Sequence, residues 1–171
     1  KSKSFGISLE ELAEDELLKM LVAQRLVPTL CRSCARKIPS KEDASKKTRS
    51  YALQQWKEWE LTATKGALKR LNDIAKQGNL KIRNPNGCTR CENMGINGRQ
   101  LVLEYVMIDD KARQLIRTNR LDELKESLLE RNWKPMSYQG WRLIEEGIAD
   151  PNMVEAVVQN VIVDSSVPWE Y

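Results

Sequence analysis

The sequence predicts a mainly α-helical fold with one short strand, organised around two Cys-x-x-Cys pairs. Apolar residues recur at helical spacing behind helix-capping residues over most of the chain, all four cysteines fall into the two pairs, and residues 100–107 have the composition of a strand. With 41% hydrophobic and 30% charged residues among 171, the chain has the composition of an ordinary globular protein and not of a disordered one.

Charge and apolar patterning restrict the class of protein further. The net charge of +4 comes from 28 basic and 24 acidic residues mixed along the chain, so no basic stripe predicts a nucleic-acid partner. No apolar run approaches the roughly 20 residues that span a bilayer, and no signal segment opens the chain, which predicts a cytoplasmic protein. The chain begins at Lys1 without an initiator methionine, so we expect it to be a piece of a longer polypeptide.

The first predicted element is a helix that begins near residue 9 and runs toward Val27. Ser8 and Glu11 have the spacing of a capping box, in which each side chain accepts a hydrogen bond from the other residue's backbone. Apolar residues follow at helical spacing, at Leu12, Leu17, Leu18, Leu21, Val22 and Leu26. We interpret them as core packing, with a docking face as the alternative. Pro28 and the first cysteine pair mark the end of this helix.

The cysteines carry the strongest chemical signal. Cys31 and Cys34 form one Cys-x-x-Cys pair and Cys88 and Cys91 the other, with residues 35–87 between them. A two-residue gap lets both thiolates of a pair face one ion, and two such pairs complete the tetrahedral sulfur shell that zinc prefers. The sequence therefore predicts one structural zinc ion bound by all four cysteines. No open position for catalysis is expected, because four cysteines fill the shell and the chain has no histidine.

Other uses of the cysteines are alternatives: disulfides, a redox Cys-x-x-Cys, or an iron–sulfur site. Disulfides need an oxidising compartment and a redox motif needs only one pair, so the doubled motif without a signal segment favours zinc. Four thiolates around a divalent ion leave a site charge of minus two. Basic residues beside the ligands either offset this charge or are solvated loop charges: Arg32, Arg36, Lys37 and Arg90.

The segment between the pairs predicts a helical insert. After a charged start over residues 41–49, apolar residues at helical spacing over residues 51–76 predict one helix or two, with Gly78 as the C-terminal stop. Because a metal would close this insert at its base, we expect it to behave as a semi-independent finger. Trp56 and Trp59 share a helix face. We interpret them as core residues of the finger, with an exposed anchor for a partner as the alternative.

Four short helices are predicted after the strand at residues 100–107, each from a residue able to cap its first turn. The expected caps and ends are Asp109 or Asp110 with Arg117, Asn119 with Arg131, Ser137 with Glu146, and Asp150-Pro151 for a last helix over residues 153–158. We expect these helices to form a small C-terminal helical bundle.

Taken in order, these elements resemble the C-terminal third of the type II secretion and type IV pilus-assembly ATPases, including the motors of conjugative thin pili. That family has a phrase such as A-Q-R-L-V before its first Cys-x-x-Cys, and residues 23–27 read Ala-Gln-Arg-Leu-Val here. Its second pair follows the pattern G-C-x-x-C, a short gap, G-Y-x-G-R and a glutamate. Residues 87–91, residues 95–99 and Glu104 match it, with Ile96 in place of the tyrosine.

Two weaker phrases extend the resemblance along the chain. Residues 112–118 are similar to the A-I-R-N-L-I-R-E helix of retraction motors, and residues 136–148 to the family phrase G-M-x-T-L with a later glycine. The insert between the cysteine pairs is longer than the family pattern and carries tryptophans that this pattern lacks.

The resemblance implies a division of the chain into four ranges. Residues 1–30 would end a RecA-like α/β ATPase core, and residues 31–98 would form a four-cysteine zinc-binding subdomain with its helical insert. Residues 99–109 would be a strand returning to the core sheet, and residues 110–171 a C-terminal helical subdomain.

The resemblance also implies a function. The upstream part of the full protein would hold a core that binds ATP and magnesium and hydrolyses ATP between hexamer subunits. This chain has no G-x-x-x-x-G-K-[ST] loop and no histidine, so we do not expect it to hydrolyse ATP alone. We expect a zinc-binding module of a hexameric ATPase that powers pilus assembly or secretion through an inner-membrane platform protein. It would lie in the cytoplasm at the inner membrane and bind no nucleic acid.

Basic residues support one alternative function and one further expectation. A free-standing zinc-ribbon module would contact nucleic acid or protein through Arg32, Arg36 and Arg90, although the scarcity of aromatic residues near the cysteines favours the motor module. The resemblance suggests that Arg25 and Arg99 are contacts near a subunit boundary. The alternative is that they pair with local carboxylates, Arg99 with Glu104.

Overall fold

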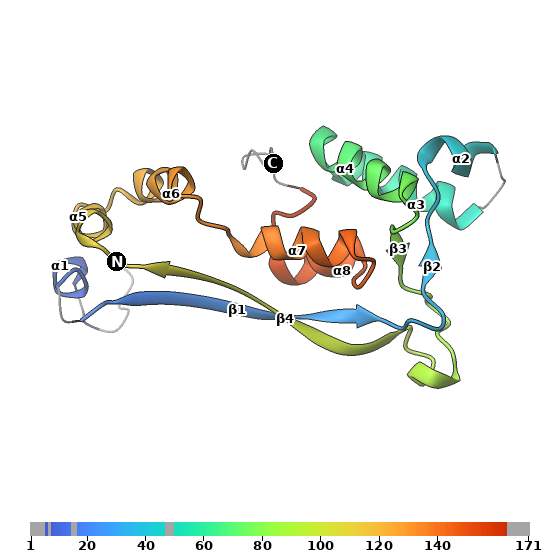
Figure 1. Ribbon diagram of the computed structural model, residues 1–171, viewed down its shortest axis with the longest axis horizontal. Helices are drawn as coiled ribbons and strands as arrows, with labels where there is room; N and C mark the ends of the chain where they lie inside the picture. Colours follow the sequence, from blue (N-terminus) through green and yellow to red (C-terminus); the bar gives the residue numbers. More distant parts are fainter. Residues whose placement is uncertain (1–5, 7, 15–16, 47–49, 164–171) are drawn as a thin grey trace. The chain divides into compact units, whose positions relative to one another are not determined.

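The computed structural model describes residues 6, 8–14, 17–46 and 50–163, which fall into two compact units (Figure 1). Unit 1 contains the described parts of residues 1–24 and 103–135, and unit 2 those of residues 25–102 and 136–171. The boundaries of the units differ from those of the four sequence ranges, whose relation to a parent fold stays a prediction.

The strand before the first cysteine pair is hydrogen-bonded to the strand after the second pair. β1 (Met20–Leu30) and β4 (Ile96–Met107) form a two-stranded sheet. The hydrogen bonds from Cys31 N to Gly95 O and from Ile108 N to Lys19 O show that the strands run antiparallel. The predicted strand at residues 100–107 is confirmed, but it is long and has a partner of similar length.

The helix predicted from residue 9 toward Val27 is wrong beyond its first turn. α1 (Leu9–Leu12) is present, and its capping box is confirmed by hydrogen bonds from Ser8 N to Glu11 Oε2 (2.7 Å) and from Glu11 N to Ser8 Oγ (3.1 Å). The residues of β1 are extended instead. Val27 is fully buried, but Leu21, Val22 and Leu26 are 47%, 54% and 55% exposed, so their interpretation as core packing is wrong. An apolar run of this length fits either a helix or a strand, and pairing with β4, which is remote in sequence, decides for the strand.

Unit 1 has a small core of its own around α5 (Asp110–Arg117) and α6 (Leu121–Glu130). Its buried residues are Ala13, Ile108, Ala112, Leu115, Ile116 and Leu124. Arg113 and Arg117 of α5 donate hydrogen bonds to the backbone carbonyls of Leu18 (3.0 Å) and Ala13 (3.3 Å). These bonds join the segment around α1 to α5.

The predicted caps of the two helices in unit 1 have different outcomes. Asp109 caps α5 as predicted, accepting a hydrogen bond from Ala112 N (2.8 Å). Asn119 does not cap α6, because Arg120 is the residue before this helix and Asn119 has a φ of 53°. Asparagine tolerates this left-handed conformation, which here ends the preceding turn and does not start the next helix.

The lowered pKa of Asp109 leads to a prediction of how the stability of unit 1 depends on pH. Its bond from Ala112 N, followed by the ion pair with Arg131, lowers the pKa of Asp109 below its ordinary value of 3.8. A lowered folded-state pKa stabilises the fold above the ordinary value, and this stabilisation is lost as the pH falls through the folded-state pKa. We expect Asp109→Ala to lower the free energy of unfolding by about 1 kcal/mol near neutral pH.

Urea denaturation near neutral pH and at about pH 3 tests this prediction. The loss caused by Asp109→Ala should shrink on acidification, because the wild-type chain then also lacks the ionised cap. Asp122→Ala, at an exposed residue in the first turn of α6, is the control and should change the free energy of unfolding by less than about 0.5 kcal/mol. An equal loss at both pH values for Asp109→Ala would contradict the prediction.

Unit 2 holds the larger core and the insert. The largest fully buried side chains are Trp59, Ile38, Leu71, Leu80, Ile144, Val27, Val102, Val154, Pro151 and Cys31. The insert forms α2 (Lys41–Lys46), α3 (Ser50–Thr62) and α4 (Lys65–Lys76), so residues 51–76 form two helices. Gly78, with φ +79°, follows α4 as the predicted stop.

Short elements complete the base of the insert and the end of unit 2. β2 (Arg36–Lys37) pairs antiparallel with β3 (Lys81–Ile82), and η1 (Thr89–Cys91) is a single 3₁₀ turn within the second cysteine pair. The last two helices within the described residues are α7 (Met136–Glu145) and α8 (Pro151–Val158).

Asp150 caps α8 as predicted, whereas Ser137 is not a cap. Asp150 accepts a hydrogen bond from Asn152 N (2.8 Å), and Pro151 occupies the first turn of α8. Ser137 is a buried residue inside α7, because the helix starts at Met136, two residues earlier than a cap at Ser137 predicts.

The two tryptophans of α3 are core residues, as predicted, and the alternative of an exposed anchor is wrong. Trp56 is 2% and Trp59 1% exposed, and their rings pack edge to face with centroids 5.1 Å apart. Trp56 Nε1 donates to Pro39 O (3.1 Å) and Trp59 Nε1 to Asn152 Oδ1 (2.7 Å). Each buried indole N–H is therefore satisfied, as burial of this group requires.

The expectation of a semi-independent finger is wrong. Besides the Trp59 bond to α8, Arg70 of α4 lies 2.7 Å from a carboxylate oxygen of Glu145 and 4.5 Å from the ring centroid of Trp141, both on α7. Thr64 N also donates to Ile162 O (3.0 Å). The insert packs on the C-terminal helices of unit 2, contacts that its sequence alone does not reveal.

We expect Arg70→Ala to lower the free energy of unfolding by about 1–2 kcal/mol, because it removes a part-buried ion pair together with a cation–π contact. Urea denaturation measures the loss, and Lys69→Ala, at an exposed neighbour on α4, is the control. A double-mutant cycle with Glu145→Gln should give a coupling energy of at least about 0.5 kcal/mol. Additive losses would show that the Arg70–Glu145 pair contributes nothing to stability.

Candidate metal centre

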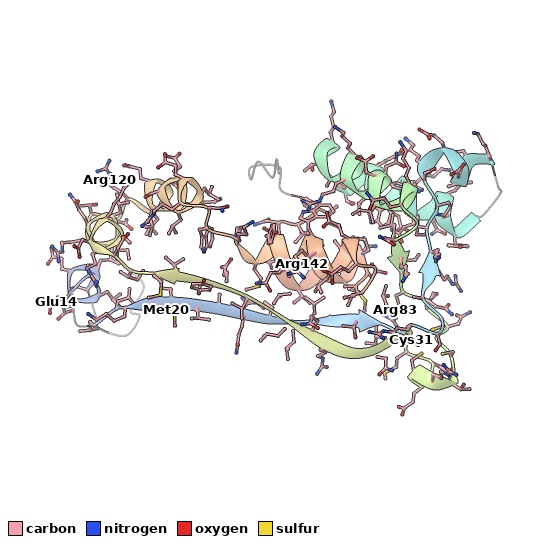
Figure 2. All side chains as sticks on the ribbon, in the orientation of Figure 1. Glu14, Met20, Cys31, Arg83, Arg120 and Arg142 are labelled. Atoms are coloured by element: carbon pink, nitrogen blue, oxygen red, sulfur yellow. The ribbon has the colours of Figure 1, made fainter. Side chains whose placement is uncertain are left out.

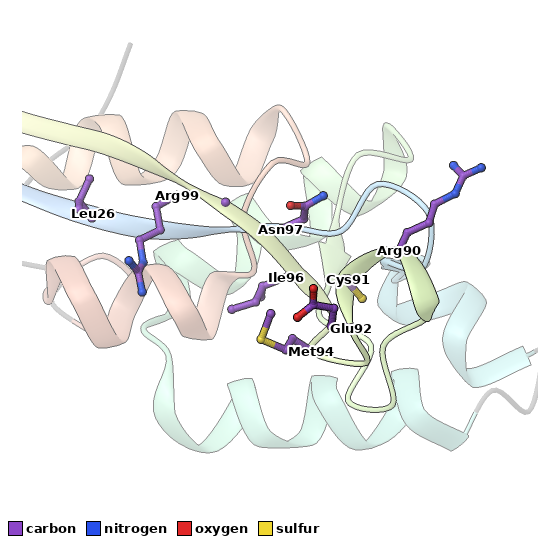
Figure 3. A pocket seen from close by; sticks show the side chains of 9 residues that line it. Leu26, Arg90, Cys91, Glu92, Met94, Ile96, Asn97 and Arg99 are labelled. Carbon is purple, nitrogen blue, oxygen red and sulfur yellow. The ribbon is translucent and has the colours of Figure 1, made fainter.

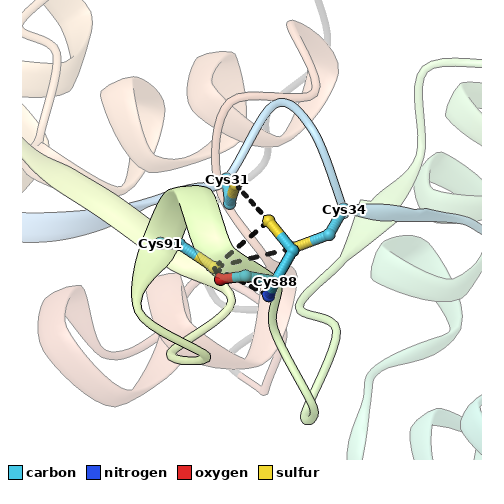
Figure 4. Close-up of side chains that lie close together, drawn as sticks. All are labelled: Cys31, Cys34, Cys88 and Cys91. Carbon is cyan, nitrogen blue, oxygen red and sulfur yellow. Dashed lines mark hydrogen bonds between the residues drawn. The ribbon is translucent and has the colours of Figure 1, made fainter.

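All four cysteine sulfurs meet in unit 2, as the spacing predicts (Figure 4). Cys31 and Cys34 follow β1, and Cys88 and Cys91 precede β4. The four Sγ atoms lie within 4.8 Å of one another. Cys31 and Cys34 lie 3.8 Å from Cys88 and Cys91 respectively, and Cys88 lies 3.7 Å from Cys91. The cluster could hold a metal ion.

The sulfur separations fit a single tetrahedral ion. With zinc–sulfur bonds of about 2.3 Å, neighbouring sulfurs of a tetrahedron lie about 3.8 Å apart, which agrees with the three separations of 3.7–3.8 Å. Sulfurs in a disulfide lie about 2.05 Å apart, and all four cysteines are free. A multi-iron cluster would hold the thiolates further apart, because its own atoms lie between them. The donor set is therefore suited to one thiophilic ion such as zinc.

Two glycines give the second cysteine pair its shape. Gly87 has φ +57° and Gly95 φ +73°, a region that side chains rarely adopt. A methyl group on Gly95 would lie 2.2 Å from Asn84 O, and one on Gly87 2.2 Å from the carbonyl carbon of Asn93. Only glycine fits these two close approaches of the backbone, so the glycines before and after the second pair are structural requirements of the site.

Backbone donors set the protonation of the sulfurs. Cys91 Sγ accepts hydrogen bonds from Cys88 N and Gly95 N, both 3.2 Å long. Burial alone raises the pKa of Cys91, but these backbone donors outweigh it and lower the pKa to about 6. A backbone donor at Ser33 lowers the pKa of Cys31. Burial, with the proton shared among neighbouring thiols, raises the pKa of Cys34 to about 12. A binding cation has to displace that proton.

Of the basic residues predicted to offset the thiolate charge, two have contacts that define their positions. Arg90 Nη1 donates to Ser33 Oγ (3.2 Å), which links the two cysteine pairs. The guanidinium of Arg36 lies 5.4 Å from the ring centroid of Tyr51. Arg32 and Lys37 are exposed. The N–H donors to Cys91 Sγ belong to the backbone of Cys88 and Gly95. Backbone donors cannot be recognised from residue types in a sequence.

Sequence reasoning missed a contact network that supports the second pair. Arg83 Nε donates to Met94 O (2.7 Å), and Arg83 N donates to Asp150 Oδ2 (2.7 Å). Burial raises the pKa of Asp150 above its ordinary value, while its backbone donors oppose this shift. Leu30 N donates to Ile148 O (2.8 Å) on the other side of the site. Only the capping role of Asp150 was visible in the sequence.

A shallow hollow of about 570 Å³ adjoins the second pair (Figure 3). Leu26, Met94 and Ile96 line it with apolar surface, and Arg90 and Arg99 contribute positive charge. Arg99 and the other predicted boundary contact, Arg25, lie exposed on β4 and β1 respectively. Their role at a subunit boundary stays a prediction.

The family is defined by a match over most of the chain. The profile of the family described as "Type II/IV secretion system protein" matches residues 3–161. This chain belongs to that family. The matched range of the secretion-system protein includes both cysteine pairs and both units, which confirms the resemblance to secretion ATPases.

Similarity to a pilus assembly ATPase supports the assignment to this family. The secretion-system chain is 30% identical over 139 residues to the type IV pilus assembly ATPase TfpB of Acinetobacter baylyi, an alignment that covers 81% of this chain. It spans 20% of that relative's length. No helix within the described residues is both long enough and apolar enough to cross a membrane.

Proposed function

We propose that this chain is the zinc-binding C-terminal module of an ATPase that powers pilus assembly or protein secretion. The observation that carries the proposal is the convergence of four cysteine sulfurs at tetrahedral spacing in a member of the secretion-system family. The similarity to a pilus assembly ATPase supports this choice within the family.

In this proposal Cys31, Cys34, Cys88 and Cys91 hold one zinc ion, which supplies a structural cross-link and no catalysis. Cys31 lies at the end of β1 and Cys91 shortly before the start of β4, so their sulfurs tie together the two strand ends. The backbone donors at Cys88 and Gly95 favour the thiolate form at Cys91.

ATP hydrolysis is assigned to a RecA-like core outside this chain, where ATP and magnesium would bind between subunits of a hexamer. We propose that residues 1–30 end that core, residues 31–98 form the zinc subdomain, residues 99–109 return to the core sheet and residues 110–171 form the C-terminal helical subdomain. The parent motor would act from the cytoplasmic face of the inner membrane on a platform protein. The relative's description as a pilus assembly ATPase and its greater length support ATP hydrolysis outside this chain.

Exposed apolar side chains on the paired strands support a link to the rest of the parent. On β1 and β4 these are Met20, Leu21, Val22, Leu26, Leu101, Tyr105 and Met107, each at least 43% exposed. Apolar side chains gathered on one exposed element commonly mark an interface, and a two-stranded sheet has two unpaired edges. We infer that exposed apolar side chains of these strands pack on the parent's own core.

Metal analysis of the 171-residue chain, purified under reducing conditions, tests the proposal. We expect one zinc per chain, no ATP hydrolysis by the chain alone, and loss of ordered structure around the cysteine pairs after chelation. A metal-free chain with intact structure would overturn the zinc assignment. Nucleic-acid affinity that falls steeply between about 50 and 200 mM salt would instead favour the free-standing binding module.

A further inference from the structure

Asp150 makes one more contact than a helix cap requires. Its Oδ1 accepts a hydrogen bond from Asn152 N (2.8 Å), which caps α8, and its Oδ2 accepts one from Arg83 N (2.7 Å). The residue is only 6% exposed. Its single carboxylate therefore bridges the start of α8 and the chain that leaves β3 toward the second cysteine pair.

Hydrogen bonds connect Arg83 to the sulfur of Cys91 through Met94 and Gly95. Arg83 Nε donates to Met94 O (2.7 Å), and the next residue, Gly95, donates its N–H to Cys91 Sγ (3.2 Å). Gly95 O in turn accepts from Cys31 N (3.1 Å). Arg83 and Cys31 lie in the same part of unit 2 (Figure 2). Asp150 thus fixes the segment that closes the loop around Cys88 and Cys91.

A cap alone does not explain an aspartate at this position. Asparagine and serine cap helices about as well as aspartate, and burying a carboxylate is costly unless it is fully hydrogen-bonded. The two bonds go to different oxygens of Asp150, and asparagine has an N–H₂ group in place of one of them, so in this geometry a donor would face either Asn152 N or Arg83 N. The carboxylate is suited to the site because it offers two acceptors that face in different directions.

We propose that Asp150 is a positioning residue of the metal centre, which holds residues 83–95 in the shape that presents Cys88 and Cys91 to the ion. The inference rests on the proposed zinc site. The connection between α7 and α8 also contacts the first cysteine pair, because Ile148 O accepts the hydrogen bond from Leu30 N immediately before Cys31.

Zinc affinity, measured by competition with a chromophoric chelator on the reduced 171-residue chain, tests the proposal. Asp150→Asn keeps the cap and removes the bridge, so we expect it to lower the zinc affinity by about 10- to 100-fold, as outer hydrogen-bond partners of metal ligands typically do. Asp109→Asn is the matched control. Asp109 also caps a helix, α5 in unit 1, and we expect its variant to stay within about two-fold of the wild-type affinity.

Amide hydrogen exchange of the zinc-loaded proteins gives a second readout. Asp150→Asn should speed exchange at residues 83–95 and leave the remainder of α8 protected, whereas the loss of a cap alone would speed exchange in α8. Should Asp150→Asn fail to fold, Arg83→Ala removes the bond to Met94 O and the charge near Asp150 from an exposed side chain, and leaves the bond from Arg83 N to Asp150. This variant should weaken zinc binding by at least about five-fold.

The two proposals fail in different ways. If the wild-type chain binds no zinc, the metal assignment fails and the positioning role is overturned with it. If the wild-type chain binds zinc and Asp150→Asn binds it equally well, the metal assignment stands and the positioning role of Asp150 is overturned.

Discussion

Replacing Cys88 with serine is expected to abolish stoichiometric zinc binding and to cause a large loss of stability. Cys88 Sγ lies 3.8 Å from Cys31 Sγ and 3.7 Å from Cys91 Sγ, so this substitution opens the sulfur shell on two edges. Serine is a poor zinc ligand because its hydroxyl stays protonated near neutral pH. A bound ligand present at about 1,000 times its Kd stabilises a fold by about 4 kcal/mol, and this stabilisation should disappear.

The expected loss corresponds to a fall in Tm of roughly 8–16 °C for a chain of this size. Metal analysis and thermal unfolding followed by circular dichroism measure both effects. Thr89→Ala is the matched control, because Thr89 lies exposed between the two ligands of the same pair, and it should keep one zinc and the wild-type Tm. A Cys88→Ser protein that retains zinc at wild-type affinity would remove Cys88 from the ligand set.

Gly95→Ala is expected to be nearly as damaging, although it replaces none of the four cysteines. The added methyl group would lie 2.2 Å from Asn84 O and 2.9 Å from Arg83 Cγ, at a φ of +73°. The left-handed conformation costs about 1–2 kcal/mol for a residue with a side chain. Since the nearest atom is backbone, relief of the clash must move the loop that carries Cys88 and Cys91. We expect a total loss of about 4 kcal/mol in the free energy of unfolding.

A second glycine provides the control for this prediction. Gly66 lies in α4, and a methyl group there would meet nothing within 4 Å. We therefore expect Gly66→Ala to stabilise the chain by about 0.5–1 kcal/mol, since alanine loses less conformational entropy in a helix. Urea denaturation of the two zinc-loaded variants compares them. If Gly95→Ala were as stable as Gly66→Ala, the close approach at Gly95 would not limit the fold.

Features fixed by local chemistry could be predicted from the sequence. The Cys-x-x-Cys spacing predicts that Cys31, Cys34, Cys88 and Cys91 meet, and their sulfurs lie together. Asp109 and Asp150 cap helices as predicted, because an N-cap requires only a side-chain acceptor beside the first turn. The zinc ion itself stays a proposal, because sulfur positions alone do not name the metal.

Features that depend on distant partners could not be predicted. The apolar run that became β1 fits either a helix or a strand, and only pairing with β4 selects the strand. The insert was predicted to be semi-independent for the same reason, because its contacts from Trp59 to α8 and from Arg70 to α7 join residues far apart in the sequence. The boundary errors at Asn119 and Ser137 are smaller, since a polar residue one position from a helix end resembles its cap.

The meeting of the four cysteines, two helix caps and the family of this protein could be predicted from the sequence, because short-range spacing and residue type are enough for each. Only the tertiary structure decided that β1 is a strand, that the insert packs on α7 and α8, and that Asp150 reaches Arg83. These depend on residues far apart in the chain, and their contact energies exist only once the backbone has brought the partners together.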